Sequence, residues 1–390
     1  MSAAIPLAGV ADAWLGVLAR DTGAAALAGI DGATLLGERA MLGGFHIPSR
    51  VSAGGGCRLY DAIGGRVALN LARPADRELL PALLETESFD VADGEAIADL
   101  IRAGDADRLV SRGRAMGLAI AAENEGAPAE AACRVMTEGL PTSPPTGRAP
   151  RVLDLSALWA GPLAAHLLWL AGAKVIKVES RTRPDAMREG DGQFFALLNQ
   201  GKASVVLDFA TVEGRDALRS LIARSDVVIE AARPRGLAQL GIDADAIVRT
   251  TPGLSWVAIT GHGAEREAAN WVGFGDDCGV AGGLSAALHA ATGRPGFVGD
   301  ATADPLTGIR AARAAWTSWA SGKGGRFGFS MRGVVAEALA QAQSGDAAAL
   351  DRAFVAWSAA AGSPFPIVRR RAVGRVSSLG ADTLAELAPC

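Results

Sequence analysis

The sequence predicts an α/β protein: a Rossmann-like, mostly parallel sheet with helices on both faces, joined to a smaller α/β domain. From residue 151 onward, short apolar runs alternate with helical patterns, which is typical of a parallel sheet. A proline-rich segment, 141–150, separates this alternation from a different pattern before it. The length of 390 residues also exceeds that of one typical domain.

The composition excludes several classes of protein. Hydrophobic residues make up 49% and charged residues 21%, which is typical of a globular protein with a large core. The net charge of −4, without a basic stripe carrying interleaved aromatics, argues against a nucleic-acid partner. The one uncharged run of membrane length, 155–173, contains Gly161-Pro162 and Gly172. We interpret it as a strand end, a turn and a buried helix, and expect no membrane partner.

Cysteine usage and the first residues predict a cytoplasmic protein. The four cysteines (Cys57, Cys133, Cys278 and Cys390) form no CxxC pair, which argues against structural zinc and a disulfide framework. The N-terminus has no basic n-region and carries Asp12, unlike a signal peptide. The histidines are isolated and show no metal-ligand spacing, so no metal is expected.

Residues 1–140 predict the smaller domain. Residues 1–45 are Ala- and Leu-rich and predict two or three helices. A glycine-rich turn with Gly54, Gly55 and Gly56 leads into a hairpin of 57–60 and 66–71. Helical patterns follow at 74–87, 94–102 and 105–116. The prolines of 141–150 exclude a helix, so this segment is the predicted linker.

Residues 151–344 predict the larger, Rossmann-like domain. Strands are expected at 152–155, 174–179, 203–208, 226–230, 254–260 and 326–330. Helices are expected at 162–170, 212–223, 243–248, 305–321 and 333–343, with an irregular then helical stretch at 273–293. In such sheets ligands bind outside the carboxyl ends of the strands. The tail 345–390 is expected to pack back on this domain.

Asp304-Pro305 marks the change from a loop to a long helix. Proline suits the first helical position, and Asp is preferred just before it, so Asp304 can be a helix N-cap. It can also be a nucleophile, since a helix N-terminus favours the ionised carboxylate, which attacks activated acyl groups. The residue alone leaves both interpretations open.

Familiar nucleotide and hydrolase motifs are missing. The turn after the first strand of the larger domain, 156–162, is not GxGxxG, and no Walker A or GxSxG motif occurs. A helix starting at Gly161-Pro162 still offers free N–H groups to a phosphate or another anion.

Five blocks, taken in order, resemble the class III CoA-transferase family of formyl-CoA transferases, carnitine CoA-transferases and alpha-methylacyl-CoA racemases. They are VLDLSALWAGPLAAHLLWLAGAKVIKVES, LLNQGKASVVLDF, SDVVIEAARPRGLAQLGID, WVAITGHG and GDATADPLTG. The ending SSLGADTLAELA is similar to the family's C-terminus. Residues 53–70 resemble the family's small domain, which normally follows the Asp-bearing half, so we expect a permuted member with its small domain first.

The resemblance assigns roles to individual residues. It places Asp304 at the catalytic aspartate, and it places three residues on the turn that holds coenzyme A: Leu158, Trp159 and Ala160. Arg181 falls where a basic residue meets the nucleotide end. His262 replaces an aromatic residue of a CoA-contacting turn. Ala231-Ala232 replaces Asn-Phe, which leaves Arg233 and Arg235 as substitute nucleotide contacts.

The resemblance implies an acyl-CoA:carboxylate CoA-transferase working through an aspartyl anhydride and an aspartyl-CoA thioester. Coenzyme A and acyl-CoA are then substrates, carboxylates are partners, no cofactor is tightly bound, and a homodimer, interlocked in the family, is expected. Gly54–Gly56 would form a lid or oxyanion loop, because both intermediates must be kept from water. Asp300 is a rival nucleophile, but only Asp304 has the family's D-x-x-T-G spacing.

Two alternatives stay open. Family racemases pair the aspartate with a histidine, and that position here is Phe274, which neither donates nor accepts a proton. This favours a transferase, although His262 as a displaced base keeps a 2-methylacyl-CoA racemase or epimerase open. The third reading is a catalytically idle CoA-binding paralogue, since a fold does not fix a function.

Overall fold

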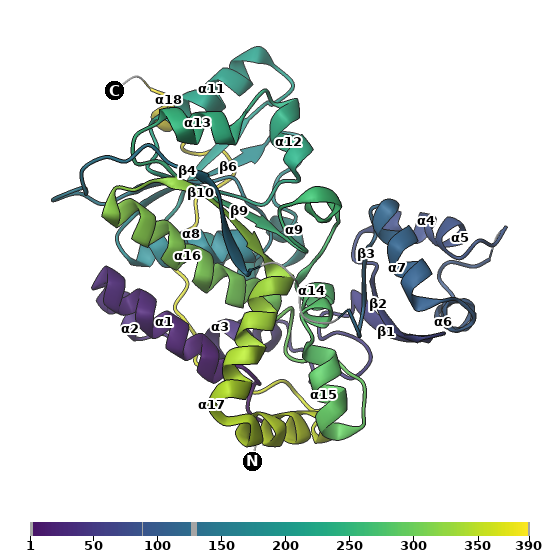
Figure 1. Cartoon of the computed structure of the whole chain (residues 1–390). Coiled ribbons are helices and arrows are strands. Elements are labelled where there is room, and N and C mark those ends of the chain that lie inside the picture. The colour runs from purple at the N-terminus through teal and green to yellow at the C-terminus, as the bar shows by residue number, and fades with distance from the viewer. Residues whose placement is uncertain (1–2, 88, 126–130, 389–390) are drawn as a thin grey trace.

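A computed structural model describes residues 3–87, 89–125 and 131–388, and it contains two separate sheets (Figure 1). The larger sheet has seven strands in the order β4-β10-β9-β8-β5-β6-β7, and its neighbours are parallel except for β4. The strands are β4 (Cys133–Glu138), β5 (Arg151–Asp154), β6 (Lys174–Ser180), β7 (Ala203–Leu207), β8 (Val227–Glu230), β9 (Ser255–Thr260) and β10 (Gly325–Ser330). The predicted α/β fold with a mostly parallel sheet is confirmed.

Strands β5, β8 and β9 lie inside the sheet and are almost fully buried, which explains their continuous apolar sequences. Edge strand β4 pairs antiparallel with β10 and is largely exposed. Its sequence, CRVMTE, has no strict alternation, and the sequence pattern did not predict it.

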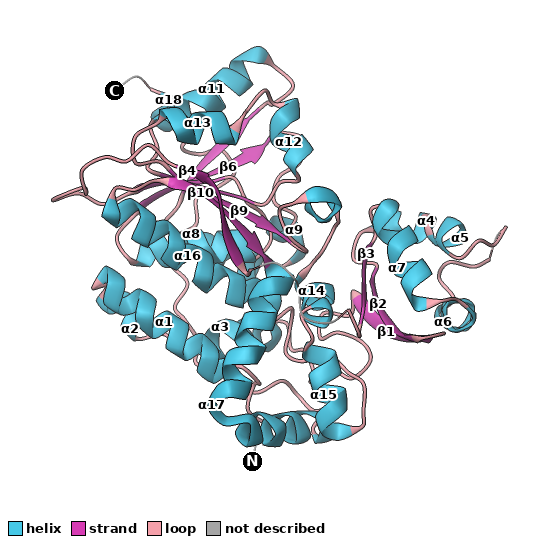
Figure 2. Ribbon diagram, in the orientation of Figure 1, coloured by secondary structure: helices cyan, strands magenta, loops and turns pink. Residues whose placement is uncertain are grey.

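Helices cover both faces of the large sheet (Figure 2). One face carries α8 (Ala160–Leu170), α10 (Gly192–Asn199) and α16 (Ala303–Ser321), which share one hydrophobic core. The other face carries α11 (Val212–Ala223), α12 (Pro234–Gln239), α13 (Ala244–Thr250) and the end of the chain. Helices α8 and α16 approach closely at Gly308, where a Cβ would lie 2.9 Å from the Ala160 carbonyl oxygen and 3.0 Å from Leu163 Cδ2.

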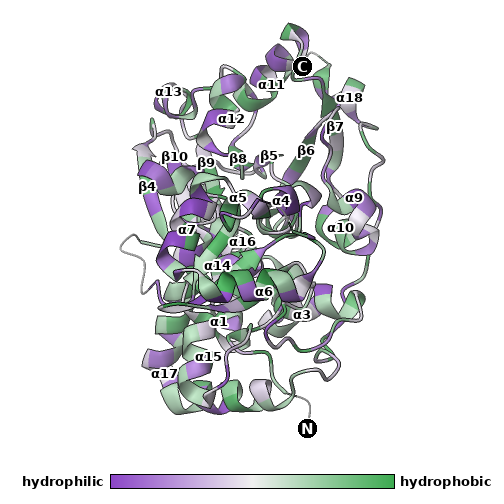
Figure 3. Cartoon of the chain, turned by 90° about the vertical axis from the view of Figure 1, so that its right-hand side faces the viewer, coloured by the Kyte–Doolittle hydropathy of each residue, from purple (hydrophilic) through white to green (hydrophobic). Residues whose placement is uncertain are grey.

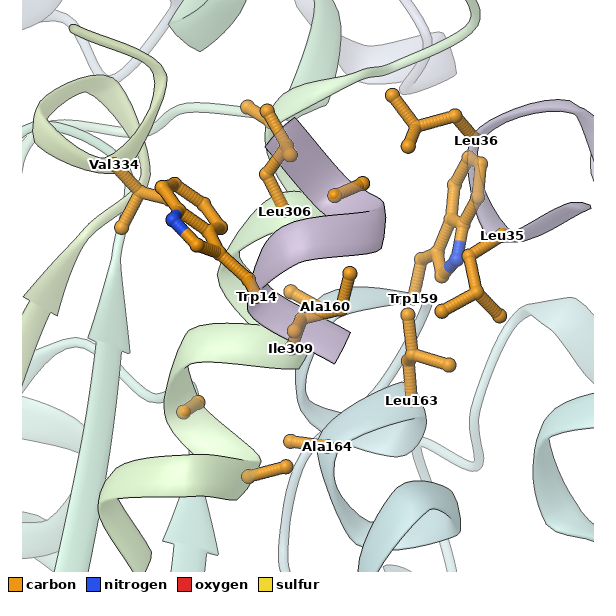
Figure 4. Packing of buried hydrophobic residues seen from close by; sticks show 14 of the residues in the cluster. Trp14, Leu35, Leu36, Trp159, Ala160, Leu163, Ala164, Leu306, Ile309 and Val334 are labelled. Carbon is orange, nitrogen blue, oxygen red and sulfur yellow. The ribbon is translucent and has the colours of Figure 1, made fainter. Parts of the chain in front are cut away.

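The first three helices confirm the prediction of two or three: α1 (Ala8–Thr22), α2 (Ala25–Ala28) and α3 (Gly32–Leu42). They extend the core of the large sheet, and Figure 4 shows Trp14, Leu35 and Leu36 beside Trp159, Leu306 and Ile309. Strand β4 likewise belongs to the large sheet although it precedes the linker. The division at 141–150 therefore stays a proposal about folding units, and packing crosses it.

The smaller sheet stands to one side of the molecule (Figure 1). Its antiparallel strands are β1 (Cys57–Ala62), β2 (Gly65–Asn70) and β3 (Ala119–Ala122), of which β3 was not predicted. Helices α4 (Pro74–Glu78), α5 (Leu80–Leu83), α6 (Gly94–Ala103) and α7 (Ala106–Ala115) accompany it, and Figure 3 shows their mixed polar and apolar faces. Its other side meets α14 (Gly275–Ala281), which joins the two halves.

The last third of the chain is more helical than predicted. Helix α15 (Leu284–Thr292) follows α14, and α17 (Met331–Ala359) runs well past residue 343 with a non-helical break at Asp346. The remaining short helices are α9 (Met187–Gly190), the 3₁₀ helix η1 (Arg266–Asn270) and α18 (Thr383–Leu387). The tail packs along β7, where the Asp382 N–H donates to the Ser204 carbonyl oxygen at 2.9 Å.

None of the helices in residues 3–87, 89–125 and 131–388 is long and apolar enough to cross a membrane. Cys57, Cys133 and Cys278 are free thiols, and Cys390 lies outside the described residues.

Candidate active site

Asp304 lies where two helices begin. It is the second residue of α16, and the cap position is Thr302, so the interpretation of Asp304 as the N-cap of its own helix is wrong. Its Oδ1 instead accepts a hydrogen bond from the backbone N–H of Ala160, the first residue of α8, at 3.2 Å. The residue as a whole is partly exposed, and its carboxyl group lies at the N-terminal ends of both helices.

Gly275 forms the wall against this carboxyl group. It is the first residue of α14, and a Cβ there would overlap Asp304 Oδ2 and the carbonyl oxygen of Ala301. The other carboxyl oxygen is the one held by Ala160. Any side chain at position 275 would therefore displace the group on which the proposed chemistry depends.

Arg39 lies beside three acids, which are Asp304, Asp300 and Asp276. It comes from α3, its Nη2 lies 2.9 Å from Asp300 Oδ1, and its guanidinium carbon lies 5.3 Å from the centre of the Trp159 ring. Burial raises the pKa of Asp304 to about 7, while the positive charge of Arg39 and the hydrogen bond from Ala160 oppose that rise. The carboxyl group is therefore held near the point at which it ionises at neutral pH.

Two further acids share this surrounding. Burial raises the pKa of Asp300 to about 7, with Arg39 opposing and Asp276 adding to the rise. Burial also raises the pKa of Asp276, whose Oδ1 accepts the Ala301 N–H at 3.0 Å. Because one guanidinium faces three carboxyl groups, ionising all three would be unfavourable.

Strained backbone lies on both sides of Asp304. Leu158 has φ 68° and Ala301 has φ 43°, both in the left-handed region that non-glycine residues rarely adopt. The Leu158 N–H donates to Asp185 Oδ1 at 3.2 Å, which holds the turn before α8. Such strain persists only where the surrounding structure imposes it, and it concentrates at functional sites.

Two buried lysines fix the loop that leads to this turn. Lys202 Nζ forms an ion pair with Asp154 Oδ2 at 2.8 Å, and both side chains are at most 1% exposed. Lys177 Nζ donates to the Ser156 carbonyl oxygen at 2.9 Å and pairs with Asp185 at 3.0 Å. The two buried lysines thus hold the loop after β5 in place through Asp154, Ser156 and Asp185.

A cavity of about 230 Å³ opens at the carboxyl ends of β5, β6 and β8. This is the place where ligands bind in open parallel sheets. Its lining joins apolar and charged groups, among them Ala157, Phe209, Arg183 and Glu230. The loop 155–160 runs from this cavity to the hydrogen bond on Asp304, so the cavity and the carboxyl group are linked by six residues of chain.

The predicted coenzyme A residues fall in different places. Ala160 contacts Asp304, Trp159 is buried under Arg39, and Leu158 lies at the strained turn between them. Arg181 is exposed and does not line the cavity, whereas Arg183, two residues later, does. The sequence analysis did not predict Arg183 or Glu230 as site residues. Arg183 follows β6 and Glu230 ends β8, and the carboxyl ends of such strands were the expected place for a ligand.

Arg233 is exposed beside Ala232, a cavity residue. Burial and the positive charges of Arg235, Arg73 and Arg183 lower its pKa. Several arginines therefore approach the cavity from both halves of the chain, and this suits an anionic ligand. The nucleotide-binding roles of Arg181 and Arg233 stay predictions.

His262 is buried and lies away from this cavity. Its Nε2 lies 3.8 Å from Asp277 Oδ2, and Arg114 Nη2 lies 3.5 Å from its Nδ1. Burial, with the charges of Arg114 and Arg332, lowers the pKa of His262 to about 3, so the ring is neutral at neutral pH. Ligand atoms of His262, Asp277 and Cys278 lie within 4.8 Å of one another. The expectation of no metal therefore stays a prediction.

The predicted lid loop lies next to Arg39. A Cβ on Gly54 would lie 2.6 Å from Arg39 Nη2, and Gly55 has φ 77°, which favours glycine. The Gly56 carbonyl oxygen accepts the Leu71 N–H at 2.8 Å, which ties the loop to the strand hairpin. The loop thus approaches the acids through Arg39, and its role as a lid or oxyanion loop stays a prediction.

Fold and site together define an α/β protein with a Rossmann-like sheet, a cavity at the carboxyl ends of its strands and a carboxyl group where the N-termini of α8 and α16 meet. A family model for CoA-transferase family III matches residues 149–350, about half of the chain. The chain belongs to this family, as the resemblance implied.

Known proteins agree with this assignment. The chain is 34% identical over 172 residues to a succinate–glutarate CoA-transferase of Agrobacterium fabrum. The matched segment covers 41% of this chain and 43% of that protein. The chain is 32% identical over 169 residues to a succinyl-CoA–D-citramalate CoA-transferase of Chloroflexus aurantiacus, 42% of each chain. The matches thus span about two fifths of the length of these relatives.

A crystal structure of a CAIB/BAIF family protein from Brucella suis is 28% identical, covers 52% of this chain and 57% of its own, and has a TM-score of 0.45.

Proposed function

We propose that this protein is an acyl-CoA:carboxylate CoA-transferase that uses Asp304 as its nucleophile. The observation that carries the proposal is the position of the Asp304 carboxyl group, which lies at the start of α16 and accepts the first N–H of α8. The names of the relatives support the reaction class, because both transfer coenzyme A between carboxylic acids.

In the proposed reaction, a carboxylate oxygen of Asp304 attacks the carbonyl carbon of the donor thioester. The C–S bond breaks, coenzyme A leaves as a thiolate, and an acyl-aspartyl anhydride remains. The thiolate then attacks Cγ of Asp304, which releases the donor acid and forms an aspartyl-CoA thioester. The acceptor carboxylate reverses both steps and leaves with coenzyme A. No net proton transfer is required.

The surrounding residues fit these steps. The Ala160 N–H holds one carboxyl oxygen, so the other is directed along Gly275, where there is no side chain. The positive charge of Arg39 favours the ionised form of Asp304, which is the nucleophilic form. The cavity at the carboxyl ends of β5, β6 and β8, with arginines near its mouth, would hold the nucleotide end of coenzyme A.

The racemase alternative has less support. A racemase needs a base to take a proton from the carbon next to the thioester and an acid to return it. Phe274 stands where the family's histidine is expected, and the ring of His262 is buried and neutral at neutral pH. Among the described residues, neither Phe274 nor His262 forms a hydrogen bond or an ion pair with Asp304, whose Oδ1 accepts the Ala160 N–H.

The test is coenzyme A exchange measured by mass spectrometry with a panel of acyl-CoA donors and dicarboxylate acceptors, starting with succinyl-CoA and glutarate. We expect a new acyl-CoA with the natural chain and none with Asp304→Ala, whereas Asp300→Asn should keep part of the activity. Hydroxylamine should convert residue 304 of the acylated protein to a hydroxamate. Exchange that survives Asp304→Ala would overturn the assignment.

Two other outcomes identify the alternatives. Solvent deuterium at the acyl α-carbon without exchange would mark a racemase, and coenzyme A binding without hydroxamate formation would mark an idle paralogue. We further propose a homodimer, as in the family, and light scattering during size-exclusion chromatography tests it.

A further inference from the structure

Ala301 forms a strained turn directly before the helix that carries Asp304. Its φ of 43° lies in the left-handed region, which is less favourable for a residue with a Cβ than for glycine. Its side chain is 5% exposed and belongs to the core shared by α8 and α16, so its methyl group contributes to packing. Contacts from the rest of the structure must therefore impose this conformation.

Asp276 provides such a contact from a different helix. It is the second residue of α14, and its Oδ1 accepts the Ala301 N–H at 3.0 Å. Gly275 lets the start of α14 come this close, since a Cβ on Gly275 would lie 2.6 Å from Ala301 Cβ. The Asp276 carboxyl group thus fixes the Ala301 N–H from outside the turn.

Ala301 in turn contacts Asp304. The Asp304 N–H donates to the Ala301 carbonyl oxygen at 2.9 Å, and Asp304 Oδ1 accepts the Ala160 N–H at 3.2 Å. Three hydrogen bonds in series therefore join Asp276 to the first residue of α8. Because Ala160 is the first helical residue, its N–H has no acceptor within its own helix and depends on Asp304.

Ser52 of the glycine-rich loop holds the Asp276 carboxyl group from another side. Its side chain is buried and its Oγ accepts the Cys57 N–H at 3.1 Å, which leaves the O–H to donate. Burial raises the pKa of Asp276, and the positive charge of Arg39 opposes the rise. Hydrogen bonds from the Ser52 hydroxyl and the Ala301 N–H also oppose it. Two donors from different segments of the chain thus orient this carboxyl group.

We propose that Asp276 is a positioning residue that sets the place of the Asp304 carboxyl group. Its oxygen keeps Ala301 in the strained conformation, and that conformation directs Asp304 to the Ala160 N–H. The inference rests on the proposed function, since it concerns the residue that would attack the thioester. Asp276 itself forms no bond to the substrate and transfers no proton.

Two substitutions separate the hydrogen bond from the volume of the side chain. Asp276→Asn keeps an oxygen that accepts the Ala301 N–H, whereas Asp276→Leu has a similar volume and no acceptor. We expect Asp276→Leu to lower kcat of coenzyme A exchange about 100-fold and to change KM for acyl-CoA less than about threefold, because a reacting group displaced by about 1 Å has an effect of this size. Asp276→Asn should stay within about fivefold of the natural kcat.

Amide hydrogen exchange, read at single residues by mass spectrometry with fragmentation, tests the same series of contacts without any substrate. In Asp276→Leu the amides of Ala301 and Ala160 should both exchange at least about tenfold faster. In Asp276→Asn both should keep their natural rates. A residue that stabilised only the turn would change the Ala301 amide and leave the Ala160 amide unchanged.

Asp243→Leu is the matched control. Asp243 Oδ1 accepts the Ala246 N–H at 2.9 Å at the start of α13, which lies on the other face of the sheet. Its loss removes the same kind of hydrogen bond, and it should leave kcat and both amides as they are in the natural chain. Asp276 is partly exposed, so Asp276→Ala, which removes the acceptor without adding a large apolar group, replaces the leucine substitution if that variant does not fold.

Failure of this inference can be told apart from failure of the proposed function. If the natural chain exchanges no coenzyme A, the proposed function fails, and the two amide rates decide whether Asp276 positions Asp304. The inference is overturned if Asp276→Leu leaves the Ala160 amide unchanged, or if Asp276→Asn loses as much kcat as Asp276→Leu.

Discussion

Arg39 Nη2 lies 2.9 Å from Asp300 Oδ1, and this ion pair brings the N-terminal helix α3 to the loop that precedes Asp304 in the other half of the chain. The same guanidinium stabilises the ionised forms of Asp276 and Asp304. One cation therefore sets how readily three neighbouring acids ionise.

The rate of coenzyme A exchange should rise with pH through about 7, because Asp304 must be ionised to attack and its pKa is raised to about 7. Arg39→Met removes the positive charge that opposes the rise in the pKa of Asp304. Its pH–rate profile should move to higher pH by about 1 pH unit. The measurement is kcat/KM from pH 5.5 to 9, with Arg313→Met, an exposed arginine of α16, as the control. An unchanged midpoint in Arg39→Met would show that Arg39 does not govern this ionisation.

Stability should fall as pH rises from about 4 to about 7, since Asp300 has a pKa of about 7 when folded and an ordinary one of 3.8. In this window the unfolded chain loses its proton while the folded chain keeps it, so ionisation favours unfolding. Above about 7 both states are ionised and this contribution becomes constant.

In the Asp300→Asn variant, the residue at position 300 cannot ionise. The loss of unfolding free energy between about pH 4 and about pH 7 should therefore be smaller than in the natural chain, by a few kcal/mol at most. Urea unfolding at pH 5 and pH 8 measures it. Asp99→Asn, at a side chain that is 72% exposed, should keep the natural dependence. If Asp300→Asn loses as much stability between the two pH values as the natural chain does, then Asp300 is not the group responsible.

Gly275→Ala should abolish exchange and destabilise the protein by about 1–3 kcal/mol, because the added methyl group would overlap Asp304 Oδ2 and the Ala301 carbonyl oxygen. Gly279→Ala in the same helix is the matched control, since its new methyl group would be 3.7 Å from Leu284 Cδ1. Assays of exchange and of thermal unfolding compare the two. Equal activity in both variants would contradict the close packing at position 275.

Lys202→Met should destabilise the protein by about 3–5 kcal/mol, because it leaves the buried Asp154 carboxylate without its partner. The double variant Lys202→Met with Asp154→Leu removes both charges and should recover much of that loss. Denaturant unfolding of the two variants and of the natural chain gives the comparison. A double variant that is less stable than the single one would show that packing at Asp154, and not its unpaired charge, dominates.

Local sequence was enough to predict most of the large sheet. Strands such as β8 (VVIE) and β9 (SWVAIT) are mainly apolar runs between turn signals, so their type follows from the residues themselves. Strands β3 and β4 were missed because AIAA is as typical of a helix, and because exposed β4 has no alternation to detect. Both are held by long-range pairing, which a single segment does not reveal.

The candidate site also contains residues that the sequence predicted and residues that only the structure revealed. The D-x-x-T-G spacing singled out Asp304, and Gly308 of that motif permits α8 to approach. Nothing around Arg39 in the sequence indicated that it would meet Asp300, because the two are far apart in the chain and only the packing of α3 brings them together.

The sequence by itself determined the parallel α/β architecture, the family and the residue most suited to be the nucleophile, because periodicity and short motifs depend on residues close together in the chain. Tertiary structure decided which atoms that residue meets. It replaced the expected N-cap contact with the N–H of Ala160 and placed Arg39 among the acids. These contacts join distant segments, and their energies depend on burial and distance, which exist only once the chain has folded.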